Sequence, residues 1–142
     1  MLDESETRRG KPCWYLTEEG EKSCIYDAVL VKETINDTLK KYFKESHIYQ
    51  FLDDAIFRTS FELYIGHKME LETVIRGKNS IEFFTPDRYR IMTKYKTSPI
   101  VRLSIELGMY LAGITDVKLH SDVKNVVHNI GYLAQVQVIE IS

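Results

Sequence analysis

Residues that interrupt helices are rare in this sequence, and so are cysteines. Three prolines and seven glycines occur in 142 residues, which leaves room for long helices. The two cysteines, Cys13 and Cys24, form no C-x-x-C pair of the kind that binds metals. We therefore interpret both as free, reduced thiols of a cytosolic protein.

Long apolar runs and a charge excess are missing as well. No apolar stretch approaches the roughly 20 residues that a membrane-spanning helix needs. The formal net charge of −2 is too small to indicate nucleic acid or an anionic membrane as a partner. The acidic start, with Asp3, Glu4 and Glu6, argues against a leader peptide. We expect one globular domain over residues 1–142.

Apolar side chains recur every three or four positions, which is the period of an amphipathic helix. This pattern predicts a helix over residues 24–45, with Ser23 as its N-cap, and a second over residues 48–75. The second would be about 40 Å long, which suits a large helical bundle. A third helix should begin at Thr85-Pro86-Asp87, because Thr is a good cap and Pro fits the first helical position.

Pro99 should break or kink the chain near residues 95–98, because it removes a backbone donor and crowds the preceding turn. A fourth helix should then run to about Gly113, and a fifth should follow Asp116. The final apolar alternation, residues 136–141, is interpreted as helix or disorder, because a lone strand would have no partner.

Several short motifs, in a fixed order and at characteristic separations, resemble the farnesyl diphosphate synthases, which are short-chain trans-prenyltransferases. The motifs are Thr7-Arg8-Arg9-Gly10 with Cys13-Trp14-Tyr15, Tyr64-Ile65-Gly66, Tyr95-Lys96-Thr97, Met109 to Ile114, and Gly131 to Gln137. Each motif is weak alone, and together they cover nearly the whole chain but only part of a family member.

The resemblance implies an all-α fold: a partial helical bundle of the trans-prenyltransferase (isoprenoid synthase) type, with about five helical segments around a deep cavity. It also implies a cytoplasmic homodimer with isoprenoid diphosphates as substrates. Members of this family condense an allylic diphosphate with isopentenyl diphosphate. Two aspartate-rich motifs hold Mg²⁺, which neutralises the departing diphosphate.

By this resemblance, Arg8 and Arg9 bind the substrate diphosphate, a task that suits the planar guanidinium group. Lys96 contacts the allylic diphosphate, and Thr97 with Gln135 stabilises the carbocation. By spacing alone, Arg8 and Arg9 would be a solvated charge pair, and Lys96 a surface lysine beside a helix break.

Three further residues are candidates by resemblance. Asp3 and Glu70 are expected near the metal site, and His67 is expected to line the cavity. Because His67 and Glu70 share one helix face, an ordinary polar pair within the bundle is an equally open interpretation.

Both aspartate-rich motifs depart from the family pattern. Asp3 stands where the last aspartate of the first motif should be, and residues 138–142 replace the second motif with one carboxylate, Glu140. Because Mg²⁺ beside a diphosphate needs several carboxylate oxygens, we expect this chain to be inactive as given. We interpret it as a family member truncated at both ends, through a truncated gene model or an isoform.

Two alternatives stay open. One is a non-catalytic helical pseudoenzyme that pairs with full-length subunits, and the other is a fragment of a terpene synthase derived from the family. We also expect apolar faces to lack partners, around Val31, Ile35 and Leu39 and around Ile130, which would favour association or a molten state.

Overall fold

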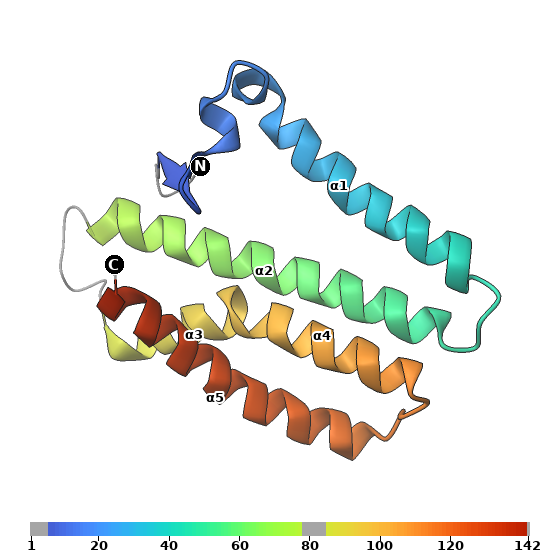
Figure 1. The fold of residues 1–142 in the computed structure, drawn as a ribbon. Coiled ribbons are helices and arrows are strands. Elements are labelled where there is room, and N and C mark those ends of the chain that lie inside the picture. Colours follow the sequence, from blue (N-terminus) through green and yellow to red (C-terminus); the bar gives the residue numbers. More distant parts are fainter. Residues whose placement is uncertain (1–5, 78–84, 142) are drawn as a thin grey trace. The chain divides into compact units, whose positions relative to one another are not determined.

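The computed structural model of this chain describes residues 6–77 and 85–141. In the described residues it contains five α-helices, which confirms the expected all-α class (Figure 1). The helices are α1 (Gly20–Phe43), α2 (Tyr49–Gly77), α3 (Pro86–Lys96), α4 (Ser98–Leu111) and α5 (Val117–Ile141). Two short strands, β1 (Thr7–Arg8) and β2 (Lys11–Pro12), and a 3₁₀ helix, η1 (Trp14–Leu16), precede α1. The sequence patterns did not predict these strands.

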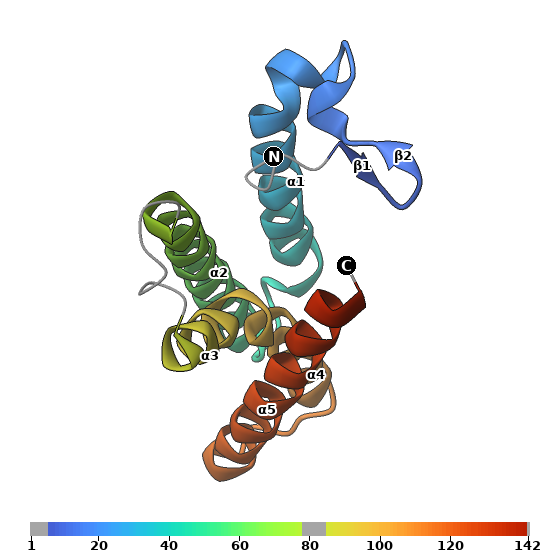
Figure 2. The same cartoon turned by 90° about the vertical axis from the view of Figure 1, so that its left-hand side faces the viewer.

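The chain divides into two compact units, residues 1–49 and 50–142. In the first unit, β1 and β2 form an antiparallel hairpin in which Thr7 pairs with Pro12 and Arg8 with Lys11 (Figure 2). The two turn residues have positive φ, 53° at Arg9 and 74° at Gly10, as a two-residue type I′ turn requires. Of the two adjacent arginines, Arg8 therefore lies in β1 and Arg9 in the tight turn.

The start of α1 is held by a small polar network. The Nε1–H of Trp14 donates to Asp27 Oδ2 at 2.7 Å, and the Ser23 hydroxyl donates to the same oxygen at 2.6 Å. Ser23 lies inside the helix, so its prediction as the N-cap is wrong. The helix starts earlier because the Thr17 hydroxyl accepts a hydrogen bond from Gly20 N at 3.0 Å, which satisfies a first-turn donor.

Apolar side chains remain exposed on α1 and α5. Val31 is 63% and Ile35 50% exposed, and Ile130 on α5 is 47% exposed, as expected for faces without partners. Leu39 is buried, so the expectation is wrong for that residue.

In the second unit, α2 lies antiparallel to the consecutive helices α3 and α4 (Figures 1 and 2). Going from the end of α2 back to its start, its contact partners on α3 and α4 have increasing residue numbers, as an antiparallel arrangement requires. In that order they are Thr73 with Arg88, Glu70 with Lys96, Glu62 with Arg102, Arg58 with Glu106, and Phe51 with Tyr110. The helix α5 packs on α3 and α4.

Helices α3 and α4 meet at the break predicted from Pro99. Helix α3 ends at Lys96 and α4 begins at Ser98, with Thr97 between them. The predicted start of α3 is also confirmed, because the Thr85 hydroxyl accepts from Arg88 N at 3.2 Å.

Two glycines let neighbouring helices approach this break. A Cβ on Gly66 of α2 would lie 2.5 Å from the backbone nitrogen of Lys96. A Cβ on Gly131 of α5 would lie 2.3 Å from the Ser98 hydroxyl and 3.0 Å from its Cα. The backbones of α2 and α5 therefore pack closely against the α3–α4 junction, and only glycine permits so close an approach.

Replacing Gly66 by alanine should destabilise the second unit, because the clash is with backbone rather than with a flexible side chain. We expect a loss of about 2 kcal/mol in unfolding free energy, measured by urea denaturation. Gly108 is the matched control, since a Cβ there meets nothing within 4 Å. Gly108→Ala should be neutral or stabilising by up to about 1 kcal/mol, and equal losses in both variants would contradict the packing argument.

The Trp14–Asp27 contact should be lost in acid. Hydrogen bonds from Ser23 and Trp14 lower the pKa of Asp27 below its usual value of 3.8. The carboxylate therefore stabilises the contact above that pH, and the stabilisation disappears as the pH falls through the lower folded pKa. Trp14 is the only tryptophan, so its emission should change on acidification below about pH 4.

The variant Asp27→Ala should show a similar altered emission already at neutral pH. The control Asp37→Ala removes an exposed carboxylate of the same helix and should leave the emission unchanged. Native emission from Asp27→Ala would show that the contact does not form.

Candidate functional site

Lys96 and Glu70 form an ion pair at the α3–α4 junction. Lys96 is the last residue of α3, and its ammonium donates to Glu70 Oε1 on α2 at 2.5 Å. The two side chains are 22% and 32% exposed, so the pair is partly shielded but reachable from solvent. A lysine in this position is a cation held in place rather than a mobile surface charge.

His67 lies one turn before Glu70 on α2. Its Nδ1 is 3.8 Å from Glu70 Oε2, a distance too long for a hydrogen bond. The ring adds to the polar surface around Glu70. The two interpretations that the sequence left open, the polar pair and the cavity lining, stay predictions.

Thr97 and Gln135 meet across the same junction. The Thr97 hydroxyl donates to the side-chain oxygen of Gln135 on α5 at 2.6 Å. Both side chains are partly buried. This bond uses the single hydroxyl hydrogen of Thr97 and leaves oxygen lone pairs on Thr97 available to a ligand.

The structure thus brings together five of the residues named from the sequence: His67, Glu70, Lys96, Thr97 and Gln135. They come from α2, the α3–α4 junction and α5, and residues up to 38 positions apart are in direct contact. Their roles stay predictions.

The other candidates lie elsewhere in the chain. Arg8 and Arg9 belong to the hairpin of the first unit, where both side chains are exposed. Asp3 lies outside the described residues. Glu140 falls within α5, but its side chain is not among those described.

A magnesium site is not formed by the side chains that the structure describes. Among them, no group of three or more His, Cys, Asp or Glu residues could hold a metal ion. Glu70, the candidate ligand in this part of the chain, is already paired with Lys96.

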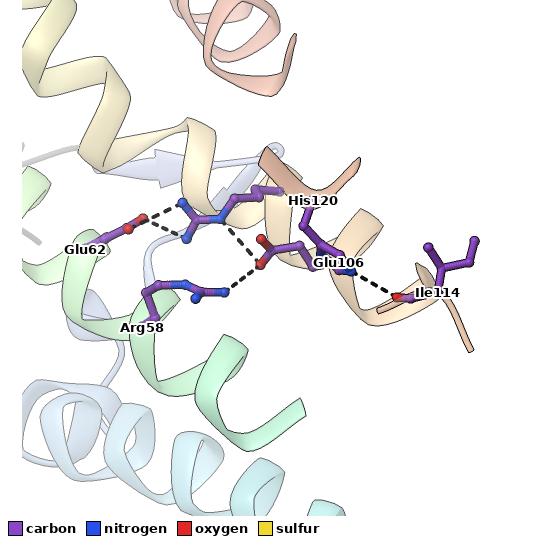
Figure 3. Close-up of polar contacts among 6 residues, drawn as sticks. Arg58, Glu62, Glu106, Ile114 and His120 are labelled. Carbon is purple, nitrogen blue, oxygen red and sulfur yellow. Dashed lines mark hydrogen bonds and ion pairs between the residues drawn. The ribbon is translucent and has the colours of Figure 1, made fainter. Parts of the chain in front are cut away.

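A buried charge network near the site was not predicted from the sequence (Figure 3). Arg102, 1% exposed, faces Glu62 through two contacts, 2.8 Å from Nη2 to Oε2 and 3.3 Å from Nη1 to Oε1. Its Nε is 3.5 Å from Glu106 Oε2, which also accepts from Arg58 Nη2 at 3.1 Å. The Arg102 Nη2 and Nε contacts are ion pairs rather than aligned hydrogen bonds.

A sequence signal for this network existed. Arg58 and Glu62, and likewise Arg102 and Glu106, are four residues apart, so each pair lies on one helix face. The spacing alone does not show that the two pairs face each other between α2 and α4.

Comparison with known proteins places the chain in a family. The model of the polyprenyl synthetase family matches residues 1–137. The chain belongs to this family. The match extends over both compact units, and the resemblance inferred from the motifs is confirmed.

Individual polyprenyl synthetases also resemble the chain. It is 34% identical over 138 residues to farnesyl pyrophosphate synthase of Homo sapiens, covering 96% of this chain and 33% of the human protein. The identities with the Bos taurus and Saccharomyces cerevisiae synthases are 33% and 31%, each over 96% of this chain and 39% of the relative. The chain thus spans between a third and two fifths of these relatives.

None of the described helices is long and apolar enough to cross a membrane.

The two arginines of the charge network should contribute unequally to stability. Arg102→Met would leave Glu62 without its buried partner, and we expect a loss of about 3 kcal/mol in unfolding free energy. Arg58 is 45% exposed, so Arg58→Met should cost less than about 1 kcal/mol. Chemical denaturation followed by circular dichroism tests both, and similar losses would contradict the assigned burial of Arg102.

Proposed function

We propose that the α3–α4 junction binds the diphosphate of an allylic isoprenoid diphosphate, in a prenyltransferase reaction of the farnesyl diphosphate synthase type. The observation that supports this most is the meeting of Lys96 with Glu70 and of Thr97 with Gln135 at one break between helices. Lys96 and Thr97 belong to one family motif, Gln135 belongs to another, and Glu70 comes from α2. Their convergence gives one site a cation and a pair of neutral polar groups.

Lys96 is the proposed ligand of the diphosphate. Its ammonium would form charge-assisted hydrogen bonds with diphosphate oxygens, and partial burial strengthens such bonds. In the unliganded chain, Glu70 is its partner at 2.5 Å. A bound diphosphate would replace the Glu70 carboxylate as the group that neutralises the lysine.

Thr97 and Gln135 are proposed to face the carbocation. In the family reaction, the allylic C–O bond breaks and the diphosphate leaves with the electron pair. The double bond of isopentenyl diphosphate then attacks the cation, and a proton is lost. Oxygen lone pairs of fixed orientation stabilise positive charge as it develops, and the 2.6 Å bond between Thr97 and Gln135 fixes both groups.

The remaining predictions from the family belong to this proposal. Arg8 and Arg9 would supply further guanidinium ligands to the diphosphate. Farnesyl diphosphate synthases use Mg²⁺, and Asp3 and Glu70 stay its predicted ligands in this chain. A cytoplasmic homodimer is also proposed, and the exposed apolar side chains of α1 such as Val31 and Ile35 are compatible with a subunit interface.

Binding tests this proposal more directly than turnover, because inactivity of the 142 residues also stays a prediction. Calorimetric titration of the chain with geranyl diphosphate should show saturable binding. Lys96→Gln should weaken it about tenfold, as expected for one lost charge-assisted hydrogen bond.

Lys68→Gln is the matched control, since Lys68 is an exposed lysine of α2. Its affinity should stay within about twofold of the unchanged chain. Equal affinity of the Lys96→Gln and unchanged chains would refute the assignment of Lys96.

A further inference from the structure

A second polar hollow lies in the unit of residues 50–142, away from Lys96, Thr97 and Gln135. It has a volume of about 250 Å³ and is formed by α2, α4 and the first part of α5. Its polar lining residues are Arg58, Arg102, Glu106, His120, Ser121 and Lys124. Figure 3 labels Arg58, Glu106 and His120 of this lining.

Cations outnumber anions in this lining. Arg58, Arg102 and Lys124 are positive, and Glu106 is the one acidic residue among the lining residues. Glu62 pairs with Arg102 from α2, so even with Glu62 counted one positive charge is left over. The hollow is thus electropositive, and residues of three helices line it.

The positive charges differ in how much bonding capacity they have left. Arg102 is buried and held by two carboxylates, so it acts as a fixed charge. Arg58 uses its Nη2 toward Glu106. Lys124 has no hydrogen bond or ion pair within residues 6–77 and 85–141, and its ammonium is available to a ligand.

His120 adds an unsatisfied group to the same lining. Its Nε2 lies 3.0 Å from the carbonyl oxygen of Ile114. A carbonyl only accepts, so Nε2 carries the hydrogen, and Nδ1 of the neutral ring is an acceptor. Nδ1 is buried and has no hydrogen-bond partner in the described part of the chain.

The N-terminus of α5 does not account for the site. Asp116 already caps that end, since its Oδ1 accepts from Leu119 N at 2.7 Å. The positive end of the helix dipole is therefore opposed by a carboxylate, and attraction for an anion must come from the side chains.

We propose that this hollow binds a small tetrahedral oxyanion of the phosphate type, either inorganic phosphate or the phosphate of a monoester. Its volume of about 250 Å³ has room for such a group. Lys124 and Arg58 supply charge-assisted donors, and Ser121 supplies a hydroxyl. The site is independent of the proposed diphosphate site, because the two share no residue.

Nuclear magnetic resonance of the full chain tests the proposal, with inorganic phosphate and glycerol phosphate as separate probes. We expect saturable shifts of the backbone amides near His120, Ser121 and Lys124. The tighter of the two probes identifies the source of the phosphate group. Lys124→Ala should weaken binding about tenfold, the loss expected for one charged donor.

Two controls separate this site from general charge effects. Lys118 is an exposed lysine of the same helix outside the lining, and Lys118→Ala should change the affinity less than about twofold. Lys96→Gln should also leave phosphate binding here unchanged. Absence of saturable shifts near Lys124, or equal weakening by Lys118→Ala and Lys124→Ala, overturns the proposal. Variants of Arg102 are avoided because their loss of stability would obscure the result.

Discussion

The close approach of two helices, α2 and α5, to the break between α3 and α4 is the constraint on which the second unit depends. Pro99 separates α3 from α4, and Gly66 and Gly131 let α2 and α5 reach the backbone at that point. A side chain larger than hydrogen at Gly66 would overlap the backbone of Lys96. Because the approach is so close, Lys96 reaches Glu70 and Thr97 reaches Gln135 through short side-chain contacts. Packing and the candidate site therefore have the same physical origin.

Paired charges between α2 and α4 continue the contact of these helices away from the junction. Arg102 is almost fully buried, which would be unfavourable without partners, and it is matched by Glu62 and Glu106. Buried pairs of this kind add little net stability but penalise any other alignment of the helices strongly. The network therefore helps to select the register in which α2 lies against α4, and this register also sets Glu70 opposite Lys96.

Two regions of the second unit present cations to small ligands, and they differ in kind. At the α3–α4 junction one lysine is neutralised by one glutamate, so an anion must compete with Glu70. In the hollow beside α5 the carboxylates are shared among more cations, and Lys124 has no partner in the part of the chain that is described. An anion can bind there without displacing a carboxylate. The difference follows from the balance of charge, since three cations share two carboxylates at the hollow, whereas Lys96 is matched by Glu70 at the junction.

The sequence by itself determined the helical segments, the break before Pro99, the cap at Thr85 and the family, because these depend on local periodicity, backbone chemistry and motif order. The hairpin around Arg9 was missed, since a positive φ at an arginine is not a local preference. Local patterns also could not tell that Glu70 pairs with Lys96 or that Arg102 is buried. A helical period shows which face of a helix is apolar but not which helix covers it. Only the tertiary structure decided those partners, through the backbone approach at Gly66 and Gly131.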